Sequence, residues 1–173
     1  MKTDNIEKYL NSFGKQVVNR AKGNLQKAGK GGNLKNSITF KVVTEADGFS
    51  VQFYMDSYGT FVDKGVSGTK TKRTFKDYKS KTISSPYKYT TKQPPSRVLD
   101  KWIVKKGIAP RDEKGRFISR KSISFLIARS IKRNGIQGIS FFQKPLGLGL
   151  KQFGKDLLEN VKEDIIEGLT TVN

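Results

Sequence analysis

The segment ITFKVVTEADGFSVQFYMDSYGTFVDKG, residues 38–65, carries the clearest structural signal in the chain. Apolar residues occupy even positions from Ile38 to Val42 and odd positions from Phe49 to Met55. Between them, Asp47-Gly48 favours a two-residue hairpin turn, because glycine accepts positive φ angles. Such a turn predicts pairs that share one face, namely Ala46 with Phe49, Thr44 with Val51, Val42 with Phe53 and Phe40 with Met55. The segment therefore predicts an antiparallel hairpin at about residues 37–56.

Two amphipathic segments flank this hairpin. Residues 4–28 repeat apolar side chains at spacings of three and four, and glycines at 29, 31 and 32 end the pattern. A second stripe runs from Leu146 to Leu169, with its acidic residues away from the stripe (Asp156, Glu159, Glu163, Asp164 and Glu167). Its period of about 3.5 residues also suits a coiled coil, but packing on the sheet is favoured. We predict an α+β fold, in which N-terminal and C-terminal helices pack a small antiparallel sheet.

The segment between the hairpin and the last helix has a different composition. Residues 66–96 are rich in Lys, Ser, Thr and Tyr and end in Pro94-Pro95, which predicts an extended arm over 66–95. Two helices are expected at about 96–106 and 119–133, ended by Gly107 and Gly135. Their predicted buried residues are Val98, Leu99, Trp102, Ile103, Ile123, Leu126, Ile127 and Ile131. The predicted organisation is one domain over 1–173, with a core of 1–65 and 136–173 and a basic insertion of 66–135.

The residue types exclude several kinds of chemistry. Cysteine and histidine are absent, which removes disulfides, thiolate and imidazole metal ligands, and catalysis by a nucleophile–histidine pair. Adjacent Asp112 and Glu113 suit a solvated charged turn better than acid–base catalysis, and Asp56 with Asp63 is a weak basis for a metal site. No apolar run approaches the roughly 18 residues of a membrane span. We expect no enzymatic activity, cofactor, metal, small-molecule substrate or membrane partner.

Positive charge is concentrated in the middle of the chain. The net charge is +19, and residues 70–133 hold 20 basic and 4 acidic residues, a net +16. Such a segment calls for an anionic partner, which could be nucleic acid, an acidic protein surface or a phospholipid face. The basic candidate contacts are Lys70, Lys72, Arg73, Lys76, Lys79, Lys81, Lys88 and Lys92. Phe75, Tyr78, Tyr87 and Tyr89 alternate with them, as in grooves that bind nucleic acid without sequence preference. The alternative is an arm that becomes ordered on assembly with a protein partner.

Two motifs resemble a known family. Tyr58-Gly59-Thr60-Phe61-Val62-Asp63-Lys64-Gly65 follows the hairpin, and Gly138-Ile139-Ser140-Phe141-Phe142-Gln143-Lys144-Pro145 precedes the last helix. In this order, after an N-terminal helix, they resemble the small neck or tail-completion proteins that join heads to tails in tailed bacteriophages. The second motif departs from the family pattern, since Pro145 follows the phenylalanines, and the segment between the motifs is unusually long.

The resemblance implies a structural virion protein at the neck or tail top, present in the host cytoplasm during assembly. It further implies a homo-oligomeric ring, expected to be a hexamer, that contacts connector or tail proteins, with DNA in the channel as a second contact. The implied turn and assembly contacts are Tyr58, Gly59, Phe61, Val62, Asp63, Gly65, Phe141, Phe142 and Pro145.

The same residues also have a structural interpretation. Tyr58 and Phe61 are expected to fill the groove between sheet and helix. Asp63 is expected to accept hydrogen bonds from turn amides, to reach a basic neighbouring subunit, or to close its own turn. Phe141 and Phe142, in a segment predicted to be extended over 138–145, are expected to cap the core.

Overall fold

The N-terminal amphipathic pattern forms one long helix, α1 (Asp4–Lys27), in the computed structural model, which describes residues 4–45 and 48–170. The predicted stripe is buried along its length (Ile6, Leu10, Phe13, Val17, Val18, Ala21 and Leu25). Gly14 lies where the helix meets the sheet, because a Cβ built there would be 2.2 Å from the Phe40 ring. The helix is therefore shaped to accept an aromatic residue of the adjoining strand.

The predicted hairpin is present, with β1 (Thr39–Glu45) antiparallel to β2 (Gly48–Tyr54). The predicted register is wrong by two residues: Phe40 pairs with Phe53, Val42 with Val51, and Glu45 with Gly48. A shift of two keeps every side chain on its own face, so the apolar face survives. Ala46 and Asp47, which the prediction placed beside and within the turn, lie outside the described residues.

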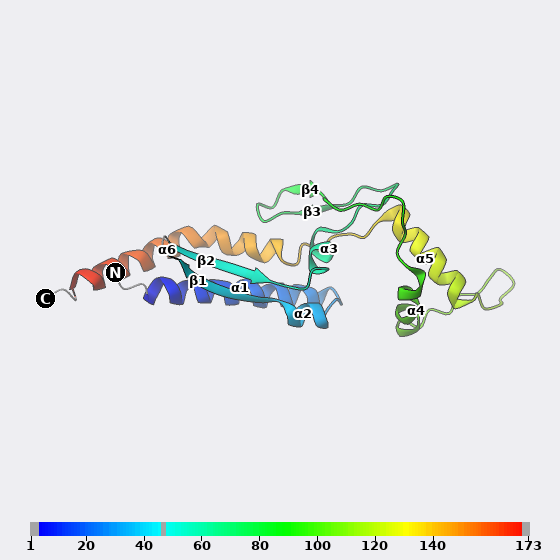
Figure 1. The fold of residues 1–173 in the computed structure, drawn as a ribbon, viewed down its shortest axis with the longest axis horizontal. Helices are drawn as coiled ribbons and strands as arrows, with labels where there is room; N and C mark the ends of the chain where they lie inside the picture. Colours follow the sequence, from blue (N-terminus) through cyan, green and yellow to red (C-terminus); the bar gives the residue numbers. More distant parts are fainter. Residues whose placement is uncertain (1–3, 46–47, 171–173) are drawn as a thin grey trace. The chain divides into compact units, whose positions relative to one another are not determined.

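The last helix, α6 (Gln143–Thr170), begins three residues before the predicted stripe. Pro145 therefore lies in its first turn, where the missing N–H has no helical partner to lose. Residues 143–145 are helical, so the prediction of an extended segment is wrong for them. The helices α1 and α6 lie side by side and antiparallel, with β1 and β2 along α1 (Figure 1). The predicted α+β class, with both terminal helices packing the small sheet, is confirmed.

Two features near the two ends of α1 were not predicted. A short helix, α2 (Asn33–Ser37), lies between α1 and β1 in the sequence, and its Leu34 is buried. Asp164 of α6 was placed on the exposed face, but it is fully buried, and its carboxylate accepts hydrogen bonds from the Asn5 and Ile6 amides at 3.2 and 3.1 Å. These amides belong to the first turn of α1, which has no partners of its own, so Asp164 caps that helix from a distance.

The chain forms two compact units. The first contains the residues up to Asp63, residues 76–82 and the residues from Ile139 onward. The second contains residues 64–75 and 83–138. The core of the first unit joins α1, α2, the hairpin and the start of α6, with Phe141 and Phe142 among its buried residues. Its aromatic rings meet edge to face, for example Phe53 with Phe142 at 5.2 Å between centroids.

A second ribbon pairs β3 (Thr74–Lys76) with β4 (Thr82–Ser84) within the predicted arm. Its tip, residues 76–82, groups with the first unit. Backbone bonds also pair two extended segments of the arm. The Ser67 amide donates to the Tyr87 carbonyl, and the Ser67 carbonyl accepts from the Tyr89 amide, each at 2.8 Å.

The second unit contains the helices α4 (Ser96–Lys105) and α5 (Arg120–Asn134), close to the predicted ranges. Gly107 and Gly135 follow them with φ angles of 64° and 70°, as predicted. The predicted buried stripe is only partly right. Ile103 and Ile123 are buried, but Val98 is 67% and Trp102 43% exposed, and Leu126 is also exposed. Buried positions that the prediction missed are Ser124 and Ala128.

Candidate functional site

The first motif forms a short helix, α3 (Gly59–Lys64), directly after the hairpin. Gly59 is buried against the core, because a Cβ there would lie 2.6 Å from the Met55 sulfur and 2.9 Å from a Leu34 methyl carbon. The first turn closes locally, with the Thr60 hydroxyl donating to the Ser57 carbonyl at 3.0 Å. Glycine at this position thus lets α3 approach the core closely.

Asp63 connects the two motifs. Its carboxylate is 3% exposed and accepts a hydrogen bond from the Phe142 amide at 2.8 Å, across 79 positions of sequence. Two backbone bonds run beside it, from Ser140 N–H to the Asp63 carbonyl at 2.9 Å and from Ile139 N–H to the Val62 carbonyl at 3.2 Å. Of the three roles expected for Asp63, the structure shows acceptance of an amide, and this amide, of Phe142, belongs to the second motif.

Ser140 holds the second motif in an unusual backbone conformation. Its φ angle is 50°, which is uncommon for a residue other than glycine, and its side chain is 2% exposed. The hydroxyl accepts from the Lys76 amide at 3.0 Å, and the Gln143 side chain accepts from the Tyr78 amide at 3.2 Å. The tip of the basic arm is therefore bonded to the beginning of α6.

Gly65 ends the first motif at a point where only glycine fits. Its φ angle is 74°, and a Cβ would lie 2.4 Å from the Gly138 nitrogen. The next residue, Val66, exchanges two backbone hydrogen bonds with Ile136, both at 2.8 Å. The two chain segments that bound the second unit therefore run side by side within it.

The aromatic residues of the two motifs separate by exposure. Phe141, Phe142 and Pro145 are buried, so the expectation that the two phenylalanines cap the core agrees with their placement. Tyr58 and Phe61 do not fill a groove as expected, since each is 44% exposed. Tyr58 directly precedes α3 and Phe61 lies within it. Gly59 and Val62 occupy the positions that face the core, so the two rings remain at the surface.

The basic residues predicted as partner contacts divide between the two units. Lys76, Lys79 and Lys81 belong to the first unit and the remaining five (Lys70, Lys72, Arg73, Lys88 and Lys92) to the second. All of the lysines are exposed. Arg73 is half-buried, and its Nε donates to the Asn134 carbonyl at 2.7 Å, which gives it a structural role. The lysines are therefore available for an anionic partner, and Arg73 is engaged within the unit.

The aromatic residues of the arm are less available for stacking than the sequence suggested. Phe75 is buried, whereas Tyr78 is exposed, with the Lys79 ammonium 5.5 Å from its ring centre. Tyr87 and Tyr89 are half-buried, and burial raises the pKa of the Tyr89 hydroxyl. Of the four rings, Tyr78 is the one that a nucleic-acid base could stack on directly.

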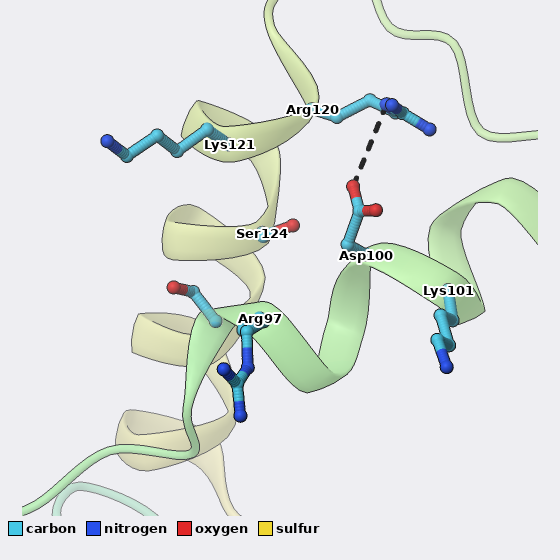
Figure 2. Close-up of a pocket in the computed structure, with 7 residues that line it drawn as sticks. Arg97, Asp100, Lys101, Arg120, Lys121 and Ser124 are labelled. Carbon is cyan, nitrogen blue, oxygen red and sulfur yellow. Dashed lines mark ion pairs between the residues drawn. The ribbon is translucent and has the colours of Figure 1, made fainter.

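A pocket that the sequence did not predict lies between α4 and α5 in the second unit. Its volume is about 620 Å³, and its lining includes Arg97, Asp100, Lys101, Arg120, Lys121 and Ser124. Figure 2 shows Arg120 and Asp100 facing each other, with 3.7 Å between Nε and Oδ1. The signal that could have revealed it is the placement of basic residues in the first turn of both helices.

Within the described ranges 4–45 and 48–170, no group of three or more acidic side chains is placed to hold a metal ion. No described helix has the length and apolar character needed to cross a bilayer. Comparison with family models, with curated protein sequences and with solved structures found no match for this chain.

Proposed function

We propose that this chain is a non-enzymatic structural protein of the phage neck or tail-completion type. In this role it assembles as a homo-oligomeric ring, a hexamer by resemblance, at the head–tail junction of the virion and contacts connector or tail proteins. The observation that supports it most is the bond from the Phe142 amide to the Asp63 carboxylate. The two motifs behind the resemblance, far apart in the sequence, form one structural element.

The surface beside this element suits association with another copy. Tyr58 and Phe61 expose aromatic area next to the element, and aromatic side chains are enriched in protein interfaces. The hairpin is a two-stranded sheet, so each strand has one edge without a partner strand in the described chain. Exposed edges of this kind accept a strand from a neighbouring molecule.

A nonsense codon in the gene, introduced into the phage that carries it, tests the role. Electron microscopy of the lysate is expected to show full heads separate from tails, or heads that have lost DNA. Intact joined particles would refute the proposal. Complementation sharpens the test: Tyr58→Ala/Phe61→Ala is expected to restore few joined particles, whereas Phe125→Ala, an exposed aromatic control in the second unit, is expected to restore them.

Nucleic-acid binding is the second candidate, supported by the net charge of +16 over residues 70–133 and the exposed lysines in that segment. Each phosphate contact contributes roughly one unit to the slope of log affinity against log salt concentration. Fluorescence anisotropy with single-stranded DNA is expected to show a smaller slope for the variant Lys70→Gln, Lys72→Gln, Lys88→Gln, Lys92→Gln.

The matched control removes the same charge from exposed positions on α1 and α6 (Lys8→Gln, Lys15→Gln, Lys151→Gln and Lys155→Gln). Equal slopes for the two variants would show that binding follows total charge and would exclude the arm as the contact. A wild-type affinity that does not change with salt would exclude phosphate contacts altogether.

A further inference from the structure

The helix pair α4–α5 places positive charge where helix electrostatics disfavours it. Arg97 is the second residue of α4, and Arg120 and Lys121 are the first two residues of α5. Neither helix has an acidic residue in its first turn. The N-terminal end of a helix carries a partial positive charge, so cations there are repelled and anions are attracted. An anion between these ends would relieve the repulsion.

The backbone at the start of α4 adds to this preference. The residue that precedes the helix is Pro95, whose side chain cannot cap the first amides. Helix α5, by contrast, is preceded by Ser119, whose hydroxyl accepts from the Ser122 amide at 3.1 Å. The first turn of α4 therefore keeps donors that an anion can use.

Ser124 provides an independent sign of a missing ligand. It is 3% exposed, lines the same pocket, and its hydroxyl oxygen has no hydrogen-bond partner in the part of the chain that the structure describes. In Figure 2 this hydroxyl, one turn along α5 from Arg120, points to the side on which Arg120 and Asp100 meet. A buried hydroxyl without a partner is unfavourable, and an ordered water, an ion or a ligand at the site would satisfy it.

The charges of the lining select the ligand. The pocket lining carries four cationic side chains (Arg97, Lys101, Arg120 and Lys121) and one carboxylate, Asp100, which already pairs with Arg120. Arginine forks, lysine ammonium groups, backbone amides and a hydroxyl are the donors that proteins use for phosphate. The volume of about 620 Å³ exceeds that of a single phosphate and lies in the range of sites for small molecules.

We infer that the α4–α5 pocket binds a phosphate group, carried either by a small phosphorylated molecule or by a nucleic-acid backbone. The site is formed by Arg97, Lys101, Arg120, Lys121 and the Ser124 hydroxyl. This inference does not depend on the proposed virion role, since all of its residues lie outside the two motifs. It also does not depend on the lysines of the arm.

The test is calorimetric titration of the full chain with inorganic phosphate, with chloride keeping the ionic strength constant. Saturable binding is expected, and Arg97→Gln/Lys121→Gln is expected to weaken it about tenfold or more. The control Lys105→Gln/Lys106→Gln removes the same charge from exposed positions at the other end of α4 and is expected to change the affinity less than about twofold. Absence of saturable binding, or equal loss in both variants, would overturn the site.

Ser124→Ala separates the ligand role from folding. Because the hydroxyl has no partner among the described residues, its removal is expected to leave the melting temperature without phosphate unchanged or higher. The same variant is expected to bind phosphate about fivefold more weakly. An unchanged phosphate affinity in Ser124→Ala would contradict the site. Competition of an oligothymidylate with bound phosphate identifies a nucleic-acid backbone as the source, and no competition identifies a small phosphorylated molecule.

Discussion

The two units of this chain treat their apolar residues differently. The first unit buries a continuous cluster of side chains from α1, the hairpin and the start of α6. Within it, Gly14 of α1 leaves room for the Phe40 ring. The second unit buries fewer apolar residues (Val66, Phe75, Ile103, Ile123 and Ala128) and leaves Val98, Trp102 and Phe125 at its surface.

The second unit relies more on polar contacts. Backbone bonds join Val66 to Ile136 and join Thr69 and Lys70 to the end of α5, and the Lys132 ammonium donates to the Thr91 carbonyl. Hydrogen bonds that exchange with water contribute less to stability than apolar burial of this extent. The comparison teaches that apolar burial holds the first unit together, whereas the second unit depends to a greater extent on polar contacts.

The largest expected difference comes from a matched pair of phenylalanines. Phe141→Ala removes a ring that is 1% exposed and is expected to lower the free energy of unfolding by about 3–5 kcal/mol. Phe125→Ala, at 50% exposure in the second unit, is expected to lower it by less than about 1 kcal/mol. Urea unfolding followed by circular dichroism measures both, and equal losses would remove the contrast between the units.

Two carboxylates that accept backbone amides provide a second pair. Asp63→Ala leaves the buried Phe142 amide without this acceptor and is expected to cost about 1–3 kcal/mol. Asp112 accepts from the Lys114 and Arg116 amides in an accessible turn of the second unit, so Asp112→Ala is expected to cost less than about 1 kcal/mol, since water replaces it. Thermal unfolding of the two variants measures both costs, and a greater loss of stability for Asp112→Ala than for Asp63→Ala would contradict the interpretation.

A pair of glycines in α1 measures how tightly the first unit is packed. Gly14→Ala places a methyl group 2.2 Å from the Phe40 ring, which must move, and is expected to cost about 1–3 kcal/mol. Gly23→Ala meets nothing within 4 Å and is expected to gain about 0.5–1 kcal/mol through helix propensity. Denaturant midpoints test the opposite signs, and a gain for Gly14→Ala would mean that the contact with the strand is loose.

The smallest expected effect is a dependence on alkaline pH. Burial, with a contribution from Asp156, raises the pKa of Tyr9 in the first unit, and burial raises the pKa of Tyr89 in the second. The folded chain therefore holds these protons at pH values where the unfolded chain has lost them, so stability falls as pH rises above about 10. Melting temperatures of Tyr9→Phe/Tyr89→Phe are expected to fall less steeply above that pH than those of the wild type. The exposed Tyr58→Phe is the control and is expected to follow the wild type.

The sequence predicted elements whose periodicity reflects burial and missed those decided by distant contacts. The helices and hairpin were found because their stripes have helical or strand periods. The register was wrong because a shift of two residues preserves the faces, so the pattern cannot distinguish the two pairings. The exposure of Trp102 was missed because an amphipathic pattern shows that a helix has an apolar face, but not that another element covers it.

The candidate site was predictable in its residues and not in its contacts. Both motifs were singled out, but the bond between Asp63 and Phe142 spans 79 positions, and no local pattern encodes it. Asp164 was placed on the exposed face for the same reason, since its partners lie at the other end of the chain. The α4–α5 pocket depends on two helices meeting, so the sequence did not show that its basic residues lie together.

The hydrogen bonds from Ile139, Ser140 and Phe142 to Val62 and Asp63 have a consequence for how this gene could change in length. They hold the two ends of the intervening segment next to each other, and within that segment residues 76–82 also belong to the first unit. Lengthening a loop whose ends are already held together adds little closure entropy, about 0.6 kcal/mol for each doubling. Evolution or an engineer can therefore exchange much of the intervening segment, provided that the contacts of residues 76–82 are kept or replaced.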